Sequence, residues 1–336
     1  MRTALLGLAA LLAAVMVAAT TIGSVGIPLG DAWAVITGHL TGNVGDLDPV
    51  SDQILWQYRV PRVVLAALCG AGLSVAGVVL QALVANPLAD PYVLGISSGA
   101  SVGAVVVLTA GAGALGGLGV SSAAFLGAVA SVAVVFALGQ HRGRLAPTRL
   151  VLAGVAVGYV LSALTSYLQL RANPNELKSV MFWLLGSVAG ARWEQLGLVS
   201  AVVLTASAVL VLYGRRLNAL VTGEESATSL GLDVRRARVG LLLVSSLLTG
   251  TLIAVAGGVG FVGLMVPHLV RLVAGADHRR VLPLSALVGA LYLVVVDLLA
   301  RTVDSPNELP LGIFTAVFGA PFFLWLLRRG RTLGET

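Results

Sequence analysis

Ten long apolar runs constrain the fold of this chain more than any other feature of its sequence. They cover approximately residues 3–24, 62–83, 92–111, 117–139, 149–170, 193–213, 237–257, 259–274, 282–300 and 311–327. About 20 consecutive apolar residues are enough for a helix to cross a bilayer, and the short alternating strands of a membrane β-barrel are not visible. We therefore expect an all-α polytopic membrane protein with about ten transmembrane helices, forming a single transmembrane domain over residues 1–336.

The composition excludes an ordinary soluble protein. The chain is 57% hydrophobic and only 11% charged, whereas a soluble domain carries about 25% charged residues. Its net charge of +6 does not indicate nucleic acid, because basic residues gather on the cytoplasmic side of membrane proteins. We expect contact with membrane lipid and none with nucleic acid. The single Cys69 and four scattered His residues exclude a disulfide framework and give no metal-ligand spacing.

The basic residues also predict the orientation. If both termini are cytoplasmic, the Lys and Arg residues outside the cell are Arg59, Arg62, Arg171, Lys178, Arg192 and Arg301, and the other 15 of the 21 lie inside. This asymmetry follows the positive-inside rule. The first 25 residues resemble a signal peptide, but no small-residue cleavage site follows, so we expect a retained first span. The predicted location is the bacterial cytoplasmic (inner) membrane.

A polar segment at 215–236 interrupts the apolar runs between the sixth and seventh predicted spans, which places it in the cytoplasm. Six of its residues are candidate contacts for a partner outside the membrane: Gly223, Glu224, Glu225, Ala227, Leu230 and Gly231. The two glycines can end or cap helices, and the two acids suit the first turn of a helix. Ala227 and Leu230 are three residues apart and would present a small apolar face.

Three glycines at the start of the third span, Gly95, Gly99 and Gly103, lie four residues apart on one helix face. Such a face lets another helix approach closely, and a role in lining a pathway is compatible with that packing. With Ser97 and Ser98 these residues also match G-x-S-x-G, the nucleophile elbow of hydrolases. That motif needs a strand–turn–helix context, whereas here it opens an apolar helix. We therefore assign all five residues to helix packing or a pathway and expect no catalytic residue.

The chain carries no visible energy source of its own. A phosphate-binding loop needs Gly-Lys-Ser/Thr, but the only lysine, Lys178, follows Leu177. Ion-coupled transporters hold carboxylates at membrane depth, and only Asp297 qualifies, with Arg301 four residues later on the same face. A local ion pair is the simpler interpretation of Asp297. The alternative function is an ion-coupled secondary transporter that uses Asp297.

An ordered set of short motifs carries a resemblance to a known family. The motifs are RVPR at 59–62, NPLADP at 86–91, LGISSGA at 94–100, GFVGL at 260–264, VPH at 266–268, ELPLG at 308–312 and GAPFFLWLL at 319–327. Together they resemble the FecCD family of ABC-importer permeases, over about residues 55–327. One departure is Gly258, where the family often has proline.

The resemblance implies a type II ABC-importer permease that translocates an iron–siderophore, haem or cobalamin (vitamin B12). It implies a second permease subunit, expected to form a homodimer, together with two cytoplasmic ATPase subunits and an external substrate-binding protein. ATP and Mg²⁺ would be bound by the ATPase, so this chain is expected to be no enzyme and to bind no cofactor or metal.

Two contact regions follow from the same resemblance. In the family, the loop that corresponds to 215–236 forms two short helices that dock into the ATPase. Arg59, Arg62 and Arg301 align with arginines that receive glutamates of the binding protein. The alternative for these arginines is structural, because they can anchor helix ends at lipid headgroups, or Arg301 can serve Asp297.

Overall fold

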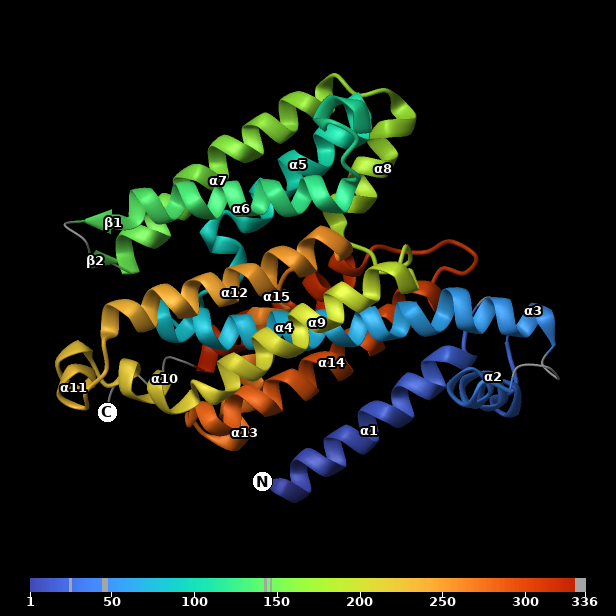
Figure 1. The fold of residues 1–336 in the computed structure, drawn as a ribbon, viewed down its shortest axis with the longest axis horizontal. Coiled ribbons are helices and arrows are strands. Elements are labelled where there is room, and N and C mark those ends of the chain that lie inside the picture. Colours follow the sequence, from blue (N-terminus) through green and yellow to red (C-terminus); the bar gives the residue numbers. More distant parts are fainter. Residues whose placement is uncertain (24–25, 44–47, 142–143, 146, 330–336) are drawn as a thin grey trace.

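The computed structural model describes residues 1–336 except 24–25, 44–47, 142–143, 146 and 330–336. Long helices run side by side along the longest axis of the molecule (Figure 1). Seven of the described helical runs are long and apolar enough to cross a membrane, and three further apolar helices are shorter. Each of the ten predicted apolar runs corresponds to one of these helices. The all-α membrane fold predicted from the apolar runs is confirmed.

The ten apolar helices are α1 (Arg2–Thr21), α4 (Val60–Val84), α5 (Ile96–Ala110), α6 (Val120–Gly139), α7 (Pro147–Leu170), α9 (Trp193–Leu212), α12 (Val234–Ala256), α13 (Val262–Ala274), α14 (His278–Thr302) and α15 (Leu311–Arg329). The shorter elements are α2 (Leu29–Thr41), α3 (Pro49–Asp52), the π-helix η1 (Gln53–Arg59), the 3₁₀ turns η2 (Pro91–Leu94) and η3 (Ala112–Leu115), α8 (Pro174–Leu185), α10 (Gly214–Val221) and α11 (Glu224–Ser229). A two-residue antiparallel pairing joins β1 (Gln140–His141) to β2 (Arg144–Leu145).

The segments between the spans also contain helices. The region that precedes the second span contains α2, and helical structure begins at Pro49 and continues through η1 into α4. The second span is thus preceded by helix rather than by an irregular chain. Asn173 is the N-cap of α8, where its side chain and that of Glu176 form a capping box.

The centre of the bundle is α4, whose span is the most buried of the seven. It packs along α14, and the two backbones approach so closely that a Cβ on Gly70 would lie 2.0 Å from the carbonyl oxygen of Gly289. Glycine is required at that contact because any side chain would displace one helix. Helices α5, α6 and α7 lie together on one side of this pair and α1 on the other (Figure 1).

Candidate functional site

The 215–236 segment folds as two short helices, α10 and α11, beyond the end of α9 (Figure 1). Gly223 precedes α11 with φ +111° and Gly231 follows it with φ +79°. Both values lie in the region that glycine adopts without steric cost, so these two residues set where α11 begins and ends. Glu224 and Glu225 occupy its first turn, where acidic groups favour the helix dipole.

The predicted apolar face of α11 requires a correction. Ala227 is completely buried, whereas Leu230 is 73% exposed. The two residues therefore do not form one exposed face. The cause is tertiary, since α11 lies against α10 and α12 and turns its alanine toward the core. Leu230 alone stands at the surface, immediately after the last turn of α11.

A pocket of about 610 Å³ lies beside Leu230, between the end of α9, α10 and the start of α12. Its lining combines apolar and charged groups: Tyr213, Arg215, Arg216, Ala219, Leu230, Gly231, Leu232, Asp233, Arg236 and Ala237. The Arg216 guanidinium stacks over the Tyr213 ring at 4.5 Å, and Arg236 pairs with Asp233 at 3.1 Å. Such a surface can accept an apolar side chain within a polar rim, as protein interfaces do.

Asn218 holds α10 against the start of α14. Its Oδ1 accepts a hydrogen bond from the backbone N–H of His278 at 2.9 Å, and its Nδ2 donates to Asp277 Oδ1 at 2.8 Å. The Asn218 amide and the Arg279 N–H hold the pKa of Asp277 below its ordinary value. The 215–236 segment is thus fastened to a long helix of the bundle. Nothing in the sequence near Asn218 predicted this contact, because its partners lie about 60 residues away.

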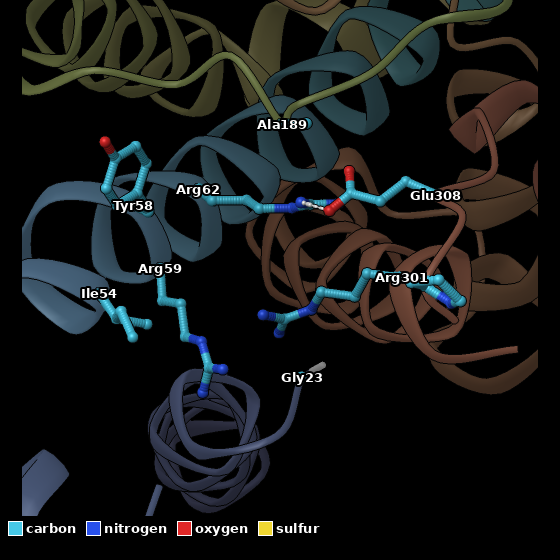
Figure 2. Close-up of a pocket in the computed structure, with 9 residues that line it drawn as sticks. Gly23, Ile54, Tyr58, Arg59, Arg62, Ala189, Arg301 and Glu308 are labelled. Carbon is cyan, nitrogen blue, oxygen red and sulfur yellow. Dashed lines mark hydrogen bonds and ion pairs between the residues drawn. The ribbon is translucent and has the colours of Figure 1, made fainter. Parts of the chain in front are cut away.

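At the opposite end of the bundle the three predicted arginines converge. Arg59, Arg62 and Arg301 come from η1, α4 and α14, and all three side chains are buried. They line a pocket of about 310 Å³, here called the arginine pocket. The remaining lining residues are Gly23, Ile54, Tyr58, Ala189, Pro306 and Glu308. Figure 2 shows the guanidinium groups pointing into the space between α1, α4 and α14.

Arg62 carries the strongest contacts in the pocket. Its Nε donates to Asp297 Oδ1 at 2.9 Å, and its Nη1 donates to Glu308 Oε1 at 2.7 Å. Both distances are those of charge-assisted hydrogen bonds. The predicted neighbour of Asp297, Arg301, lies farther away, with Nε 3.7 Å from Oδ2. The local pair expected from the i, i+4 spacing is therefore present, but Arg62 is the closer partner.

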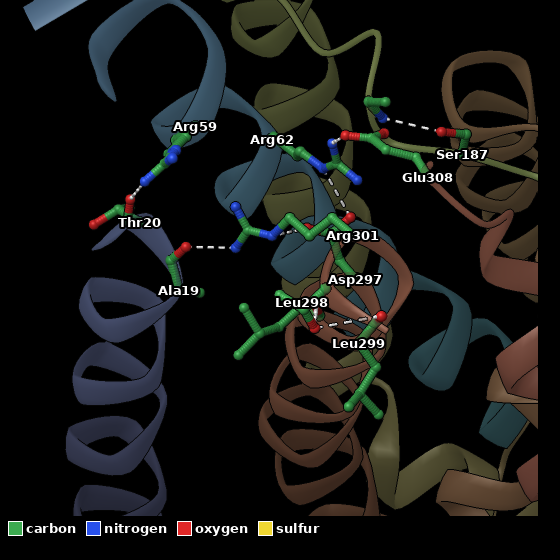
Figure 3. Close-up of polar contacts among 12 residues, drawn as sticks. Ala19, Thr20, Arg59, Arg62, Ser187, Asp297, Leu298, Leu299, Arg301 and Glu308 are labelled. Atoms are coloured by element: carbon green, nitrogen blue, oxygen red, sulfur yellow. Dashed lines mark hydrogen bonds and ion pairs between the residues drawn. The ribbon is translucent and has the colours of Figure 1, made fainter. Parts of the chain in front are cut away.

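Arg59 and Arg301 reach backbone carbonyl groups at the end of α1 (Figure 3). Arg59 Nη1 donates to the carbonyl oxygens of Thr20 and Thr21 at 2.9 and 3.0 Å, and Arg301 Nη2 donates to that of Ala19. The last carbonyls of a helix have no intrahelical donor and carry its negative dipole. The two cations therefore bind α1 to the bundle as well as lining the arginine pocket.

Asp297 is only 1% exposed and faces two guanidinium groups. Both cations belong to the chain itself, and one lies at each carboxylate oxygen. An ion-coupling carboxylate has to gain and lose its cation during transport, and this geometry gives no support to that use of Asp297. Its evident role is to anchor Arg62 and Arg301.

The glycine face of α5 packs against α6. A Cβ on Gly99 would lie 2.3 Å from the Gly127 carbonyl oxygen, and one on Gly103 would lie 2.0 Å from that of Ala123. Gly95, at φ +71°, caps α5 and accepts a hydrogen bond from Ser131 Oγ at 2.8 Å.

Ser97 and Ser98 are half-buried in the first turn of α5, which follows the 3₁₀ turn η2. The strand that a nucleophile elbow requires is therefore not what precedes Ser97, and the structure offers no hydrolase geometry at this motif.

Nearly the whole chain is similar to proteins of one known family. The profile of the FecCD transport family matches residues 11–329. The chain belongs to the FecCD transport family. A cobalamin import system permease, BtuC of Halobacterium salinarum, is 46% identical over 275 residues, which is 82% of this chain and 73% of that protein. The hemin transport system permease HmuU of Yersinia pestis is 42% identical over 279 residues, 81% of this chain and 82% of that protein.

A solved structure agrees with these relatives. It is a metal-chelate type ABC transporter in an inward-facing conformation, with a TM-score of 0.85 and 32% identity, covering 98% of this chain and 100% of the other. This FecCD chain is therefore a multi-pass membrane permease of the ABC-importer class, a component of transport rather than an enzyme.

Proposed function

We propose that this permease translocates a large metal chelate or tetrapyrrole-type compound, namely an iron–siderophore, haem or cobalamin, across the bacterial cytoplasmic membrane. An external binding protein delivers the substrate, and two copies of the chain enclose the pathway. Relatives named for cobalamin and hemin, and a metal-chelate transporter of the same fold, support this class of substrate.

The 215–236 segment is the proposed contact with the ATPase. The observation that carries this assignment is Leu230, which is a large apolar side chain 73% exposed on a polar segment and set beside a pocket. An exposed apolar side chain within a polar rim matches the anatomy of protein interfaces, in which an apolar centre is surrounded by polar groups. ATP and Mg²⁺ are bound by that partner, and this chain contributes the surface through which ATP hydrolysis moves it.

The second proposed contact, with the binding protein, is the arginine pocket. Arg–carboxylate bonds give such a contact register and attract an acidic partner from a distance. The two contacts lie at opposite ends of α14. Asn218 is bonded at its first residue, and Asp297 and Arg301 lie near its last. We infer that α14, packed along α4, moves as one body between the ATPase and the external face.

Substitution of Leu230 tests the ATPase contact. Leu230→Asp should reduce co-purification of the ATPase, and substrate uptake in reconstituted vesicles, by about tenfold or more, because loss of a central apolar anchor costs at least ~1.4 kcal/mol. The matched control is Ser229→Asp, which adds the same charge to the neighbouring exposed residue and should retain most of the activity. Normal assembly and uptake in the Leu230 variant would exclude the proposed contact.

A further inference from the structure

The arginine pocket already contains carboxylates of its own. Glu308 lines the pocket and bonds Arg62, and Asp297 pairs with Arg62 and Arg301. Together with Arg59, these side chains carry one positive charge in excess. The helical lining of the pocket comes from η1, the start of α4 and the end of α14, and these parts of the chain lie at the end of the bundle away from α10 and α11 (Figure 1). An acidic group that approaches from outside therefore meets a positive pocket in which a resident carboxylate holds one guanidinium.

The two resident carboxylates differ in how firmly they are held. Asp297 belongs to the interior of α14 and is 1% exposed. Glu308 belongs to the non-helical segment between α14 and α15, and its side chain is 45% exposed. Asp297 cannot leave Arg62 without a change in the helix packing, whereas Glu308 can leave by rotation of its own side chain.

The backbone around Glu308 would stay in place during such a rotation. The N–H of Leu309 donates to the carbonyl oxygen of Ala300 at 2.9 Å, and the N–H of Leu311 donates to that of Gly186, also at 2.9 Å. These bonds fasten the chain immediately after Glu308, where α15 begins. Only the Glu308 side chain, which points across the pocket to Arg62 (Figure 2), is free to exchange.

We propose that Glu308 is a resident substitute for a carboxylate of the external binding protein, and that docking replaces Glu308 on Arg62 with the partner's acidic side chain. The proposal rests on the proposed function, since it takes the binding protein as the partner. Arg62 keeps its bond to Asp297, but its Nη1 loses its carboxylate when Glu308 leaves, so a second carboxylate stabilises Arg62 in both the free and the docked state. Exchange of one carboxylate for another meets that need.

The exchange also explains why Arg62 differs from its two neighbours. Arg59 and Arg301 donate to backbone carbonyls of α1. These contacts keep α1 in place, and a carboxylate of an incoming protein does not replace them. Arg62 instead bonds one fixed carboxylate and one half-exposed carboxylate. Glu308 thereby competes with every acidic ligand of the pocket, and this competition favours a partner that supplies carboxylates at the correct spacing.

Removal of the Glu308 carboxylate, which competes for Arg62, tests the proposal. The full-length permease with its ATPase, in lipid nanodiscs, is assayed for binding of the external substrate-binding protein that the proposed function requires. Glu308→Gln should tighten Kd by about three- to fivefold, the amount expected from loss of one partly exposed competing ion pair. Glu308→Asp retains the charge on a shorter side chain, so its Kd should lie between those of Glu308→Gln and the wild type.

A second acidic residue controls for net charge. Glu194, in the first turn of α9 at the same end of the bundle, does not line the pocket, so Glu194→Gln should leave Kd unchanged. Equal tightening in both glutamine variants, or a Glu308→Gln value equal to or weaker than wild type, would overturn the proposal. If the wild-type complex fails to bind the binding protein at all, it is the proposed function that fails.

Discussion

At the scale of single residues, the molecule places its few charges where they can be paired. Arg62 enters the bundle from α4 and meets Asp297 of α14, although the two residues are 235 positions apart. A buried charge is tolerated only when it is paired and hydrogen-bonded. The pair therefore ties the two central helices together at one end, and Arg301 adds a second cation to the same carboxylate.

Neutralisation of Asp297 should show how much the stability of the protein depends on its pairing with Arg62 and Arg301. Asp297→Asn keeps the shape of the side chain but leaves Arg62 and Arg301 facing each other without their common anion, so we expect a loss of stability of about 3 kcal/mol. Thermal unfolding of the purified protein in detergent measures it. Glu308→Gln is the matched control, since a half-exposed ion pair contributes less than about 1 kcal/mol. Equal stability of the two variants would show that Asp297 is not the anchor of the arginines.

At the scale of helices, close backbone approach replaces hydrophobic burial as the organising force. Lipid is as apolar as a leucine side chain, so membrane helices associate through small residues and van der Waals contact. Two such contacts illustrate this packing. One joins α4 to α14 at Gly70 and Gly289, and the other joins α5 to α6 at Gly99 and Gly103. A contact of a different kind, outside the spans, is made by the hydrogen bonds of Asn218 to Asp277 and His278 at the start of α14.

A single methyl group should be enough to disturb the α5–α6 contact. Gly103→Ala would place its Cβ 2.0 Å from the Ala123 carbonyl oxygen, and we expect a loss of about 1–3 kcal/mol from overpacking. Gly240→Ala, in α12, meets no atom within 4 Å and should be neutral or stabilising by up to ~1 kcal/mol, because alanine is the better helix former. Thermal melting curves in detergent measure the stability of both variants. A stable Gly103→Ala protein would contradict the packing.

At the scale of the whole molecule, the two proposed contact surfaces lie at opposite ends of one helical bundle. Met1 shares a pocket with Ala274 and Arg280, at the same end as α10. This arrangement suits an even number of crossings, with the start of the chain and the 215–236 segment on one side of the membrane. From the positive-inside rule, we predict that this side faces the cytoplasm.

Cysteine labelling checks the orientation. Thr222 and Asn175 are exposed at opposite ends of the bundle, and the native Cys69 is completely buried, so single added cysteines report their own positions. An impermeant maleimide should label Asn175→Cys in right-side-out vesicles and Thr222→Cys only in inverted ones. The reverse pattern would place the 215–236 segment outside the cell and exclude contact with an ATPase in the cytoplasm.

The sequence alone determined the features that depend on neighbouring residues. Apolar length identified the membrane helices, Gly223 and Gly231 marked the limits of α11, and ordered motifs indicated the family that the profile confirms. The tertiary structure alone decided which side chains meet. It turned Ala227 inward, left Leu230 exposed, and brought Arg62 to Asp297 and Glu308. Hydropathy and helix signals act within a few residues along the chain, whereas these contacts join segments far apart in sequence and arise only when the helices pack.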